Sequence, residues 1–597
     1  MPDAGPSHIL LREDAADWET VKPERFVLGV IHNVTSATRL LDLLKPFEGD
    51  SRVQVLFACT GSSAFTEGLR EFITERKLPC ISWEEAKREK FDLAVSSSRG
   101  GDLHQLNAPL VGAPHGAGYN KYLSRKPEAG SRKPEAGSRK PEAGSRKPEA
   151  GSRKPEAGSR KPEAFGLGAE WLVHDGELIP SAIVLSHDEQ RERLRRGCPE
   201  AVPFSVVAGD PCMDQLLAGV PFRDEYRAAL GVRPGQKLLV LTSTWKDQSL
   251  LGAHRADLEI IRRSLAELPA DEYRVLHAVH PNAWFTHGGH QIREWFEPFL
   301  RAGLLLPSPE TDIWKAALVA ADAFIGDHGS LTLYAAALGV PGLLGAFDED
   351  TVAEGSPMDL LGRELPRVTR HEPLGRQLQR AAAAQAGPQR ERLAEIGALV
   401  TSRPLQAAGL LRSLYYERMK LDEPQHPAIS RPVALPLPLP AERRQPGAAA
   451  VYADMQGGRL RRYPAELQGS LTHHLPDPYL VAAYGEPDPR WAHAADVILA
   501  RSLHSGESWE DAARRVFRRH PSCELVAFPQ EATGCLAFTR DRLQRLTAQW
   551  QDGAPSWPYD FSVAASALYS TLTSRSASSV RVSVVDGLPP AVLTISR

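Results

Sequence analysis

Short apolar runs alternate with helical segments along much of the chain, and this alternation constrains the fold more than any other feature. The pattern is typical of parallel sheets with helices on both faces. It comes as two series separated by a crossover near 223–235, with apolar runs at 26–31, 53–58, 91–95, 109–113, 181–186 and 204–208, then 237–243, 274–279, 304–306 and 323–325. We therefore predict an α/β chain with two facing, doubly wound, Rossmann-like domains.

The remaining segments complete the domain prediction. Residues 421–447 are rich in proline and include Leu-Pro-Leu-Pro-Leu-Pro, which favours a stiff linker. Residues 448–597 contain an amphipathic helical pattern and a few strand-like runs, which predicts a small α+β domain whose role the sequence does not indicate. The two larger domains are then expected at 1–222 and at 223–420, with closing helices after the second sheet.

Residues 124–164 repeat the heptapeptide SRKPEAG within the first of these domains. The period of seven does not predict a coiled coil, because each copy has alanine as its only apolar residue and a proline that removes a helix hydrogen bond. The composition predicts a solvated, disordered insertion in one loop. A basic arm that binds an anionic lipid or polymer is the alternative.

Charge and cysteine content narrow the functional classes. A net charge of −3 gives no overall field that would attract nucleic acid. The six cysteines form no C-x-x-C pair and no Cys/His cluster at ligand spacing, so we expect neither a disulfide framework nor a metal site. No signal-peptide pattern and no membrane-spanning apolar run occur. We expect a cytoplasmic protein without a transmembrane segment, and a peripheral position at the inner membrane face stays open.

The segment 323–344 combines a strand, a tight turn and a helix start. The apolar run 323–325 is followed by Gly-Asp-His-Gly-Ser and then by leucines at helical spacing. Ser330 would lie at a helix N-terminus, where N–H groups and the helix dipole favour an anion such as phosphate. Helix capping by Asp327 or Ser330 explains the same residues equally well. The candidate residues in this turn are Asp327, His328, Gly329 and Ser330.

Other loops that follow predicted strands supply the remaining candidates, because ligands bind at the carboxyl ends of strands in open α/β sheets. The loop 112–122 has three glycines and one histidine, His115, although a lone histidine is more often structural. His280 follows a strand of the second series. The other candidates are Gly116, Gly209, Asp210, Asp214, Thr242, Ser243, Thr244, Trp245 and Lys246.

These motifs occur in an order that resembles the CDP-glycerol glycerophosphotransferases of wall teichoic acid synthesis, and more broadly nucleotide-sugar transferases of GT-B fold. The matching elements, spread over about residues 25–400, are His115-Gly116, Gly209-Asp-Pro-x-x-Asp214, Leu241-Thr-Ser-Thr-Trp245, His280-Pro281, and Asp327-His-Gly-Ser330 with Ala335-Ala-Ala-Leu-Gly-Val-Pro341.

The resemblance implies a role for each motif. His115 would be the general base on the acceptor side, His280 would contact the donor phosphates, and Asp327 with Ser330 would close the donor site. The implied donor is CDP- or UDP-linked, and the implied acceptor is a hydroxyl compound, with polymeric or lipid-linked acceptors included. The implied process is cell-envelope or polysaccharide synthesis without a cofactor.

The residues are chemically consistent with such a transfer. The ordinary pKa of histidine suits a base near pH 7, and a Gly-Ser helix start with a second histidine can stabilise a leaving diphosphate without metal. The sequence departs from the family at Cys212 and Ala278, where arginines are usual. Lys246 and Arg255 are the candidate replacements for these cations.

Two other functions stay open at this point. A nucleotide-sugar epimerase shares the architecture but needs carboxylates in the cleft, for which Asp210, Asp214 and Asp327 are candidates. A degenerate transferase would be a binding scaffold, and the presence of both His115 and His280 argues against it. A P-loop NTPase is disfavoured because 231–237 has the wrong spacing for a phosphate-binding loop and lacks the Ser or Thr that holds Mg²⁺.

Overall fold

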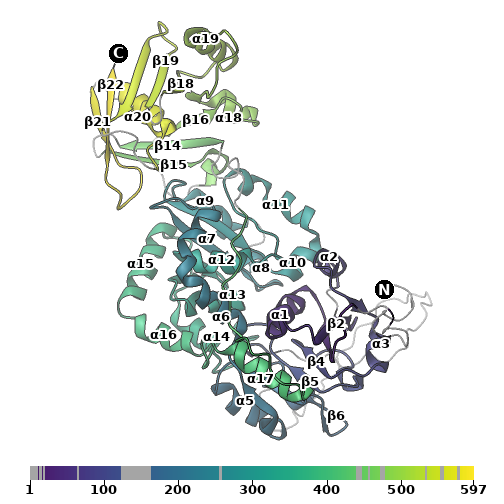
Figure 1. Ribbon diagram of the computed structural model, residues 1–597. Coiled ribbons are helices and arrows are strands. Elements are labelled where there is room, and N and C mark those ends of the chain that lie inside the picture. Colours follow the sequence, from purple (N-terminus) through teal and green to yellow (C-terminus); the bar gives the residue numbers. More distant parts are fainter. Residues whose placement is uncertain are drawn as a thin grey trace, which may run out of the picture.

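The computed structural model (Figure 1) describes Leu11, Asp17 and residues 20–63, 66–122, 163–253, 258–437, 447–454, 458–470, 478–530, 534–551, 557–573 and 578–596. Nearly all of the predicted repeat insertion therefore lies outside the described residues, as does the candidate cation Arg255. Two parallel α/β units and a third, mixed sheet follow one another along the chain. The predicted α/β class with parallel sheets is confirmed.

The first unit is a seven-stranded parallel sheet in the order β3-β2-β1-β4-β5-β8-β9. Its strands are β1 Arg25–Ile31, β2 Val53–Cys59, β3 Cys80–Ile81, β4 Leu93–Ser96, β5 Leu110–Gly112, β8 Ala182–Leu185 and β9 Ser205–Val207, and a small hairpin pairs β6 Val173–His174 with β7 Glu177–Leu178. Its helices are α1 Val34–Leu44, α2 Leu69–Glu75, α3 Trp83–Arg88, α4 Ala169–Leu172, α5 Glu189–Gly197 and α6 Pro211–Gly219.

The second unit is a four-stranded parallel sheet in the order β11-β10-β12-β13. Its strands are β10 Lys237–Thr242, β11 Tyr273–Ala278, β12 Ala323–Gly326 and β13 Gly342–Leu344. Its helices are α7 Arg223–Ala229, α8 Leu250–Ala253, α9 Glu259–Ala266, α10 Pro281–His287, α11 Gly289–Arg301, α12 Ile313–Ala320, α13 Ser330–Ala337, α14 Pro357–Glu364, α15 Leu374–Ala386 and α16 Arg390–Ala398. The run predicted as a strand at 304–306 makes only a single bridge, Leu276↔Leu305.

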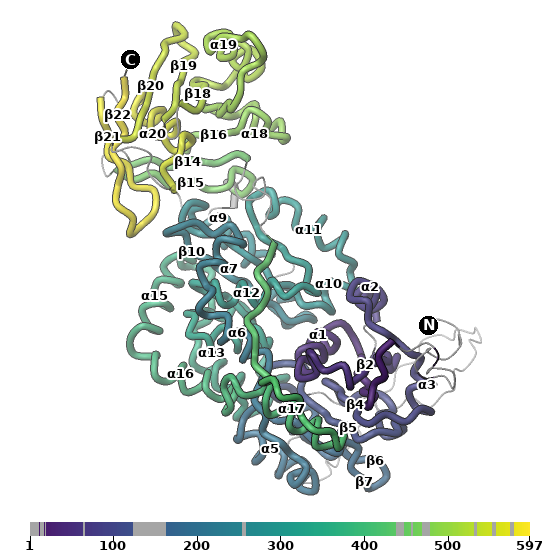
Figure 2. The backbone as a smooth tube through the Cα atoms, in the orientation of Figure 1, coloured from purple at the N-terminus to yellow at the C-terminus, as the bar shows by residue number. Residues whose placement is uncertain are grey.

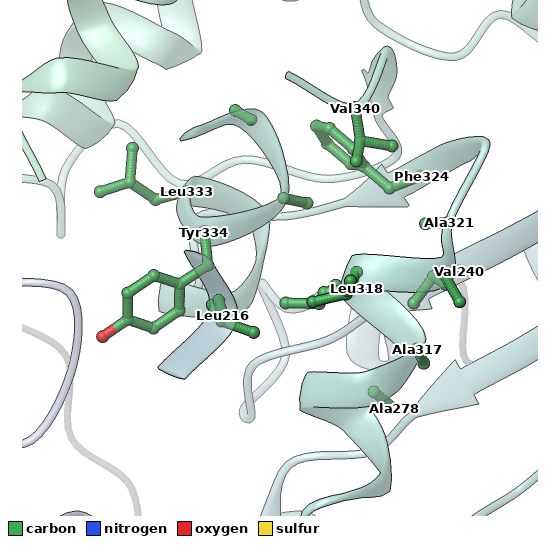
Figure 3. Close-up of a cluster of buried hydrophobic side chains, with 14 of the residues drawn as sticks. Leu216, Val240, Ala278, Ala317, Leu318, Ala321, Phe324, Leu333, Tyr334 and Val340 are labelled. Atoms are coloured by element: carbon green, nitrogen blue, oxygen red, sulfur yellow. The ribbon is translucent and has the colours of Figure 1, made fainter. Parts of the chain in front are cut away.

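The core of the second unit positions α13, the helix that begins at the predicted turn. Figure 3 shows Leu318 of α12 between Val240 of the sheet and the side chains of α13. Leu318 and Leu333 are fully buried, so truncating either side chain to alanine should cost about 2–5 kcal/mol. Tight packing of α13 fixes the position of its N-terminus.

Two buried ion pairs of α1 lie where the first unit meets the second. Arg39 lies 2.9 Å from Asp210, which also accepts a hydrogen bond from the hydroxyl of Tyr334. One turn further along α1, Asp42 lies 3.0 Å from Lys315 of α12 and accepts a 2.7 Å hydrogen bond from Gln215. These side chains are almost completely buried, so the two units form one continuous interface here.

The chain then returns to the first unit before it reaches the third sheet. Helix α17, Ala407–Met419, packs Tyr415 and Tyr416 against Phe47. Residues 421–437 contain no helix or strand and run from α17 along α6 and α12 (Figure 2). Val433 is buried, and its carbonyl accepts a 2.6 Å hydrogen bond from Tyr226. The first half of the predicted linker is therefore packed against the protein.

The third sheet has nine strands in the order β15-β14-β16-β17-β18-β19-β20-β22-β21. The strands are β14 Ala448–Asp454, β15 Arg459–Pro464, β16 Tyr479–Ala483, β17 Val497–Leu499, β18 Leu525–Gln530, β19 Gly534–Thr539, β20 Arg545–Trp550, β21 Ser579–Val582 and β22 Ala591–Ser596, with helices α18 Pro489–Ala494, α19 Trp509–Arg519 and α20 Phe561–Thr573. The sheet curls until its first and last strands meet at the bridge Arg459↔Ser583, and it packs around α20. The sequence indicated only three of these strands.

The third sheet contacts the second unit through buried polar groups. The guanidinium of Arg462 makes two hydrogen bonds to Asp271, of 2.8 and 2.6 Å, and a third to Ser562. Figure 1 shows this sheet at one end of the molecule, beside the second unit and away from the first. The third sheet is thus remote from the loops of the first unit.

Candidate active site

Loops from the carboxyl ends of the two parallel sheets meet between the first and second units. The backbone N–H of Ala117 donates to the hydroxyl of Ser330 at 3.2 Å. The ammonium of Lys121 donates to the hydroxyl of Thr244, also at 3.2 Å. The loop that follows β5 therefore contacts the loops after β10 and β12, as expected for a site at strand carboxyl ends.

His115 lies in this loop, and its side chain is accessible to solvent on one side. Its ring lies 6.1 Å from the ring of Phe165. Desolvation by the surrounding protein lowers the pKa of His115 to about 4, and the charge of Lys121 lowers it further. At neutral pH the imidazole is uncharged and has a lone pair that can accept a proton.

His280 approaches from the second unit, at the N-terminus of α10. Its Nδ1 accepts a 3.0 Å hydrogen bond from the backbone N–H of Asn282, so the neutral ring carries its proton on Nε2. Burial lowers the pKa of His280 to about 3, with smaller contributions from Lys121 and His115. The His280 ring lies 6.4 Å from that of Trp245, which follows Thr244, the residue that Lys121 of the first unit contacts.

His328 repeats this arrangement on the adjacent loop. Its Nδ1 accepts a 3.3 Å hydrogen bond from the backbone N–H of Asp348, which again leaves the proton on Nε2. Burial lowers the pKa of His328 to about 3, and Lys121 adds to the shift. His280 and His328 are therefore neutral N–H donors over the whole physiological pH range.

Asp327 holds the loops after β10 and β12 together, and its buried side chain is not exposed to a ligand. The carboxylate is fully buried and accepts hydrogen bonds from three backbone N–H groups, those of Thr244 at 2.7 Å, Leu250 at 2.9 Å and Gly329 at 2.9 Å. Burial raises the pKa of Asp327, while the N–H groups oppose this shift. The structure therefore buries this candidate behind the loops of the site, where it joins the loop after β10 to the start of α13.

The candidates that follow β10 divide into two groups. Thr242 bonds to Thr332 at 2.9 Å, and the hydroxyl of Ser243 accepts the N–H of Leu251 at 3.1 Å, so both hold the loop together. Thr244, Trp245 and Lys246 lie nearer the interface: Thr244 contacts Lys121, Trp245 lies 6.4 Å from His280, and the ammonium of Lys246 stands 4.6 Å above the ring of Trp245.

The candidates Gly209, Asp210 and Asp214 have structural partners. Asp210 accepts the first N–H groups of α6 and pairs with Arg39. Asp214 accepts the backbone N–H groups of residues 405 and 407 and the hydroxyl of Ser430. Gly209 has φ +85°, and a side chain there would meet the carbonyl of Arg403 at 3.0 Å. Asp210 reaches the interface between the two units through Tyr334, but no hydrogen bond or ion pair in the described part of the chain joins any of these three residues to His115 or His280.

Lys121 is the site residue that the sequence analysis missed. The half-buried side chain enters from the first unit, and its charge affects the pKa values of His115, His280 and His328 together. The available signal was a lysine at the end of the glycine-rich loop 112–122. Because the repeat starts only three residues later, this lysine was not distinguished from the lysines of the repeat.

No described helix combines the length and apolar character needed to cross a bilayer. No group of three or more His, Cys, Asp or Glu side chains among the described residues is placed to hold a metal ion.

Comparison with known proteins gives structural similarity without sequence relatives. Neither a protein-family model nor a curated protein matches the chain. The wall teichoic acid polymerase TagF is similar over 67% of this chain and 90% of its own, with 14% identity and a TM-score of 0.42. A protein from Listeria monocytogenes described as a UDP-N-acetylglucosamine 2-epimerase is similar over 68% of this chain and 99% of its own, with 11% identity and a TM-score of 0.36. Anabaena Alr3699/HepE, solved with UDP-glucose, is similar over 66% of this chain and 95% of its own, with 10% identity and a TM-score of 0.33. The family that the spaced motifs resemble is thus also represented among these solved structures.

Proposed function

We propose that the protein transfers a glycosyl or glycerophosphoryl group from a nucleotide-activated donor to a hydroxyl acceptor. The observation that carries this proposal is that the loop of His115, residues 112–122, contacts both the N-terminus of α13 and the loop 242–246, whose Trp245 lies beside His280. A base on one side and phosphate-binding donors on the other are the two requirements of such a transfer.

His115 would accept the proton of the acceptor hydroxyl. The acceptor oxygen then forms a bond to the transferred group, the bond from that group to the leaving nucleotide breaks, and the proton stays on the imidazole. In the protein alone, a pKa of about 4 makes His115 a weak base at neutral pH. The negative charges of a bound donor offset the charge of Lys121, which raises the pKa toward the range that suits proton transfer.

The second unit would hold the leaving nucleotide. His280 and His328 offer Nε2–H donors, and α13 offers its first N–H groups and the hydroxyl of Ser330. Asp327 fixes the relative position of these groups. The donor would be CDP- or UDP-linked, and the acceptor a hydroxyl compound of cell-envelope or polysaccharide synthesis, polymeric and lipid-linked acceptors included.

Calorimetric titration with CDP, UDP, GDP and ADP tests the proposal. We expect a pyrimidine nucleotide to bind and to slow hydrogen exchange at 242–246 and 326–331. If none of the four nucleotides binds, the proposal of a nucleotide-dependent transferase is wrong.

Two histidine variants then separate an enzyme from a binding scaffold. His115→Ala should lower turnover by roughly 10²–10⁴-fold and leave nucleotide affinity nearly unchanged, because the base acts on the acceptor. His280→Ala should weaken nucleotide binding by about 1.5–3 kcal/mol, as for a hydrogen bond to a charged group. If both variants lose affinity equally, His115 belongs to the nucleotide site and is not the base.

A further inference from the structure

The loop that carries Lys121 is attached to the second unit by its backbone. Lys121 pairs with Val352 in an antiparallel bridge. On either side, the N–H of Tyr122 donates to Thr351 at 2.9 Å, and the N–H of Ala353 donates to Asn120 at 2.8 Å. The position of Lys121 in the interface therefore does not depend on its own side chain.

Two carboxylates, those of Asp327 and Asp348, lie close enough for their charges to act on the ammonium of Lys121. Neither forms an ion pair with it among the described residues, where the ammonium donates its hydrogen bond to Thr244. Both carboxylate oxygens of Asp327 are engaged by backbone N–H groups. His115, His280 and His328, on whose pKa values the charge of Lys121 acts, are neutral. A half-buried cation in such surroundings attracts an anion.

We propose that Lys121, a residue of the first unit, binds the diphosphate of the donor held by the second unit. An ammonium has three N–H donors, and the bond to Thr244 uses one of them, so two can reach phosphate oxygens. This inference rests on the proposed function and adds a cation that the sequence motifs lack. The donor is thereby specified as a nucleoside diphosphate derivative, and its binding connects the two units.

Lys237 is the control, because it is an exposed lysine away from the site. It is the first residue of β10, at the opposite end of that strand from the loop 242–246, and its ammonium stands 5.4 Å above the ring of Tyr273. Its charge is screened by water. Replacing Lys121 and Lys237 by methionine removes the same charge at two different places.

The experiment is calorimetric titration of wild type, Lys121→Met, Lys121→Arg and Lys237→Met with UDP, CDP, UMP and CMP. We expect Lys121→Met to weaken binding of the preferred diphosphate about 10- to 100-fold, the range for one hydrogen bond to a charged group, and binding of its monophosphate much less. Lys121→Arg should recover most of the affinity, and Lys237→Met should change it less than about threefold.

Each outcome decides a different point. If wild type binds none of the four nucleotides, the proposed function fails. If wild type binds a diphosphate and Lys121→Met binds it equally well, only the role of Lys121 is wrong. An equal loss for diphosphate and monophosphate overturns the assignment to the diphosphate. A melting curve for each variant shows whether it is folded. If folded Lys121→Arg loses as much affinity as Lys121→Met, the proposal is also contradicted.

Discussion

The hydroxyl of Ser330 lies 3.2 Å from the backbone nitrogen of Ala117, so the first turn of α13 touches the loop that carries His115. Gly116, which lies between His115 and Ala117 in the sequence, leaves room for this contact, because a Cβ there would lie 2.4 Å from the same hydroxyl oxygen.

We predict that Gly116→Ala destabilises the protein by about 1 kcal/mol, because the hydroxyl of Ser330 must rotate away and lose its hydrogen bond. In a Ser330→Ala background the same change should cost little, since the remaining contact is an ordinary 3.4 Å. Urea denaturation of the four proteins measures this double-mutant cycle. Equal costs in both backgrounds would show that the two loops do not touch.

We predict that kcat falls at a higher pH than kcat/KM on the acidic side of the pH–rate profiles. A base must be neutral to accept a proton, so both parameters fall as the pH drops through the pKa of His115. In the free protein that pKa is lowered to about 4. In the donor complex the diphosphate offsets the charge of Lys121, so the limb of kcat should lie at higher pH than the limb of kcat/KM. Coincident limbs in the pH–rate profiles would argue against this coupling.

We predict that Asp327→Ala loosens the loops after β10 and β12 together. The change leaves the N–H groups of Thr244, Leu250 and Gly329 without their acceptor, and each unsatisfied group costs about 1–3 kcal/mol. Hydrogen exchange should speed up at all three amides. Asp350→Ala, at an exposed position, is the control and should leave these amides unchanged.

We predict that the first two units fold without the third sheet, but only if the chain is cut in the right place. A cut after Lys420 removes the buried Val433 and its hydrogen bond from Tyr226, whereas a cut after Leu437 keeps both. The longer fragment should melt at the higher temperature. Insolubility of both fragments would mean that the third sheet, through contacts such as Arg462 with Asp271, is needed for the second unit to fold.

The parallel sheets were predictable because their strands are buried on both faces. β10 was expected at 237–243 and spans Lys237–Thr242, and β12 was expected at 323–325 and spans Ala323–Gly326. Apolar runs bounded by turn residues carry this signal locally. The third sheet was harder, because strands such as β20, Arg545–Trp550, contain several polar residues and pair in part with strands far along the chain, here β22.

The site was only partly predictable, for a related reason. The helix start at Ser330 and the two histidine loops follow from local patterns. The partners of Asp214 at residues 405 and 407, and the contact between Lys121 and Thr244, join positions more than a hundred residues apart. Local spacing contains no information about such contacts, so a capping or ion-pairing carboxylate and a catalytic one look the same in the sequence.

The paired charges on α1 also limit how this protein can change over evolutionary time. Loss of Asp210 alone would leave Arg39 buried without its counter-ion, and loss of Asp42 alone would leave Lys315 with only the half-exposed carboxylate of Asp312. Such intermediates are disfavoured, whereas replacement of both partners by apolar side chains is tolerated. Positions 42 and 315, and positions 39 and 210, should therefore vary as pairs among homologues. The first of these pairs joins the two units, so its covariation would record their contact in the sequences themselves.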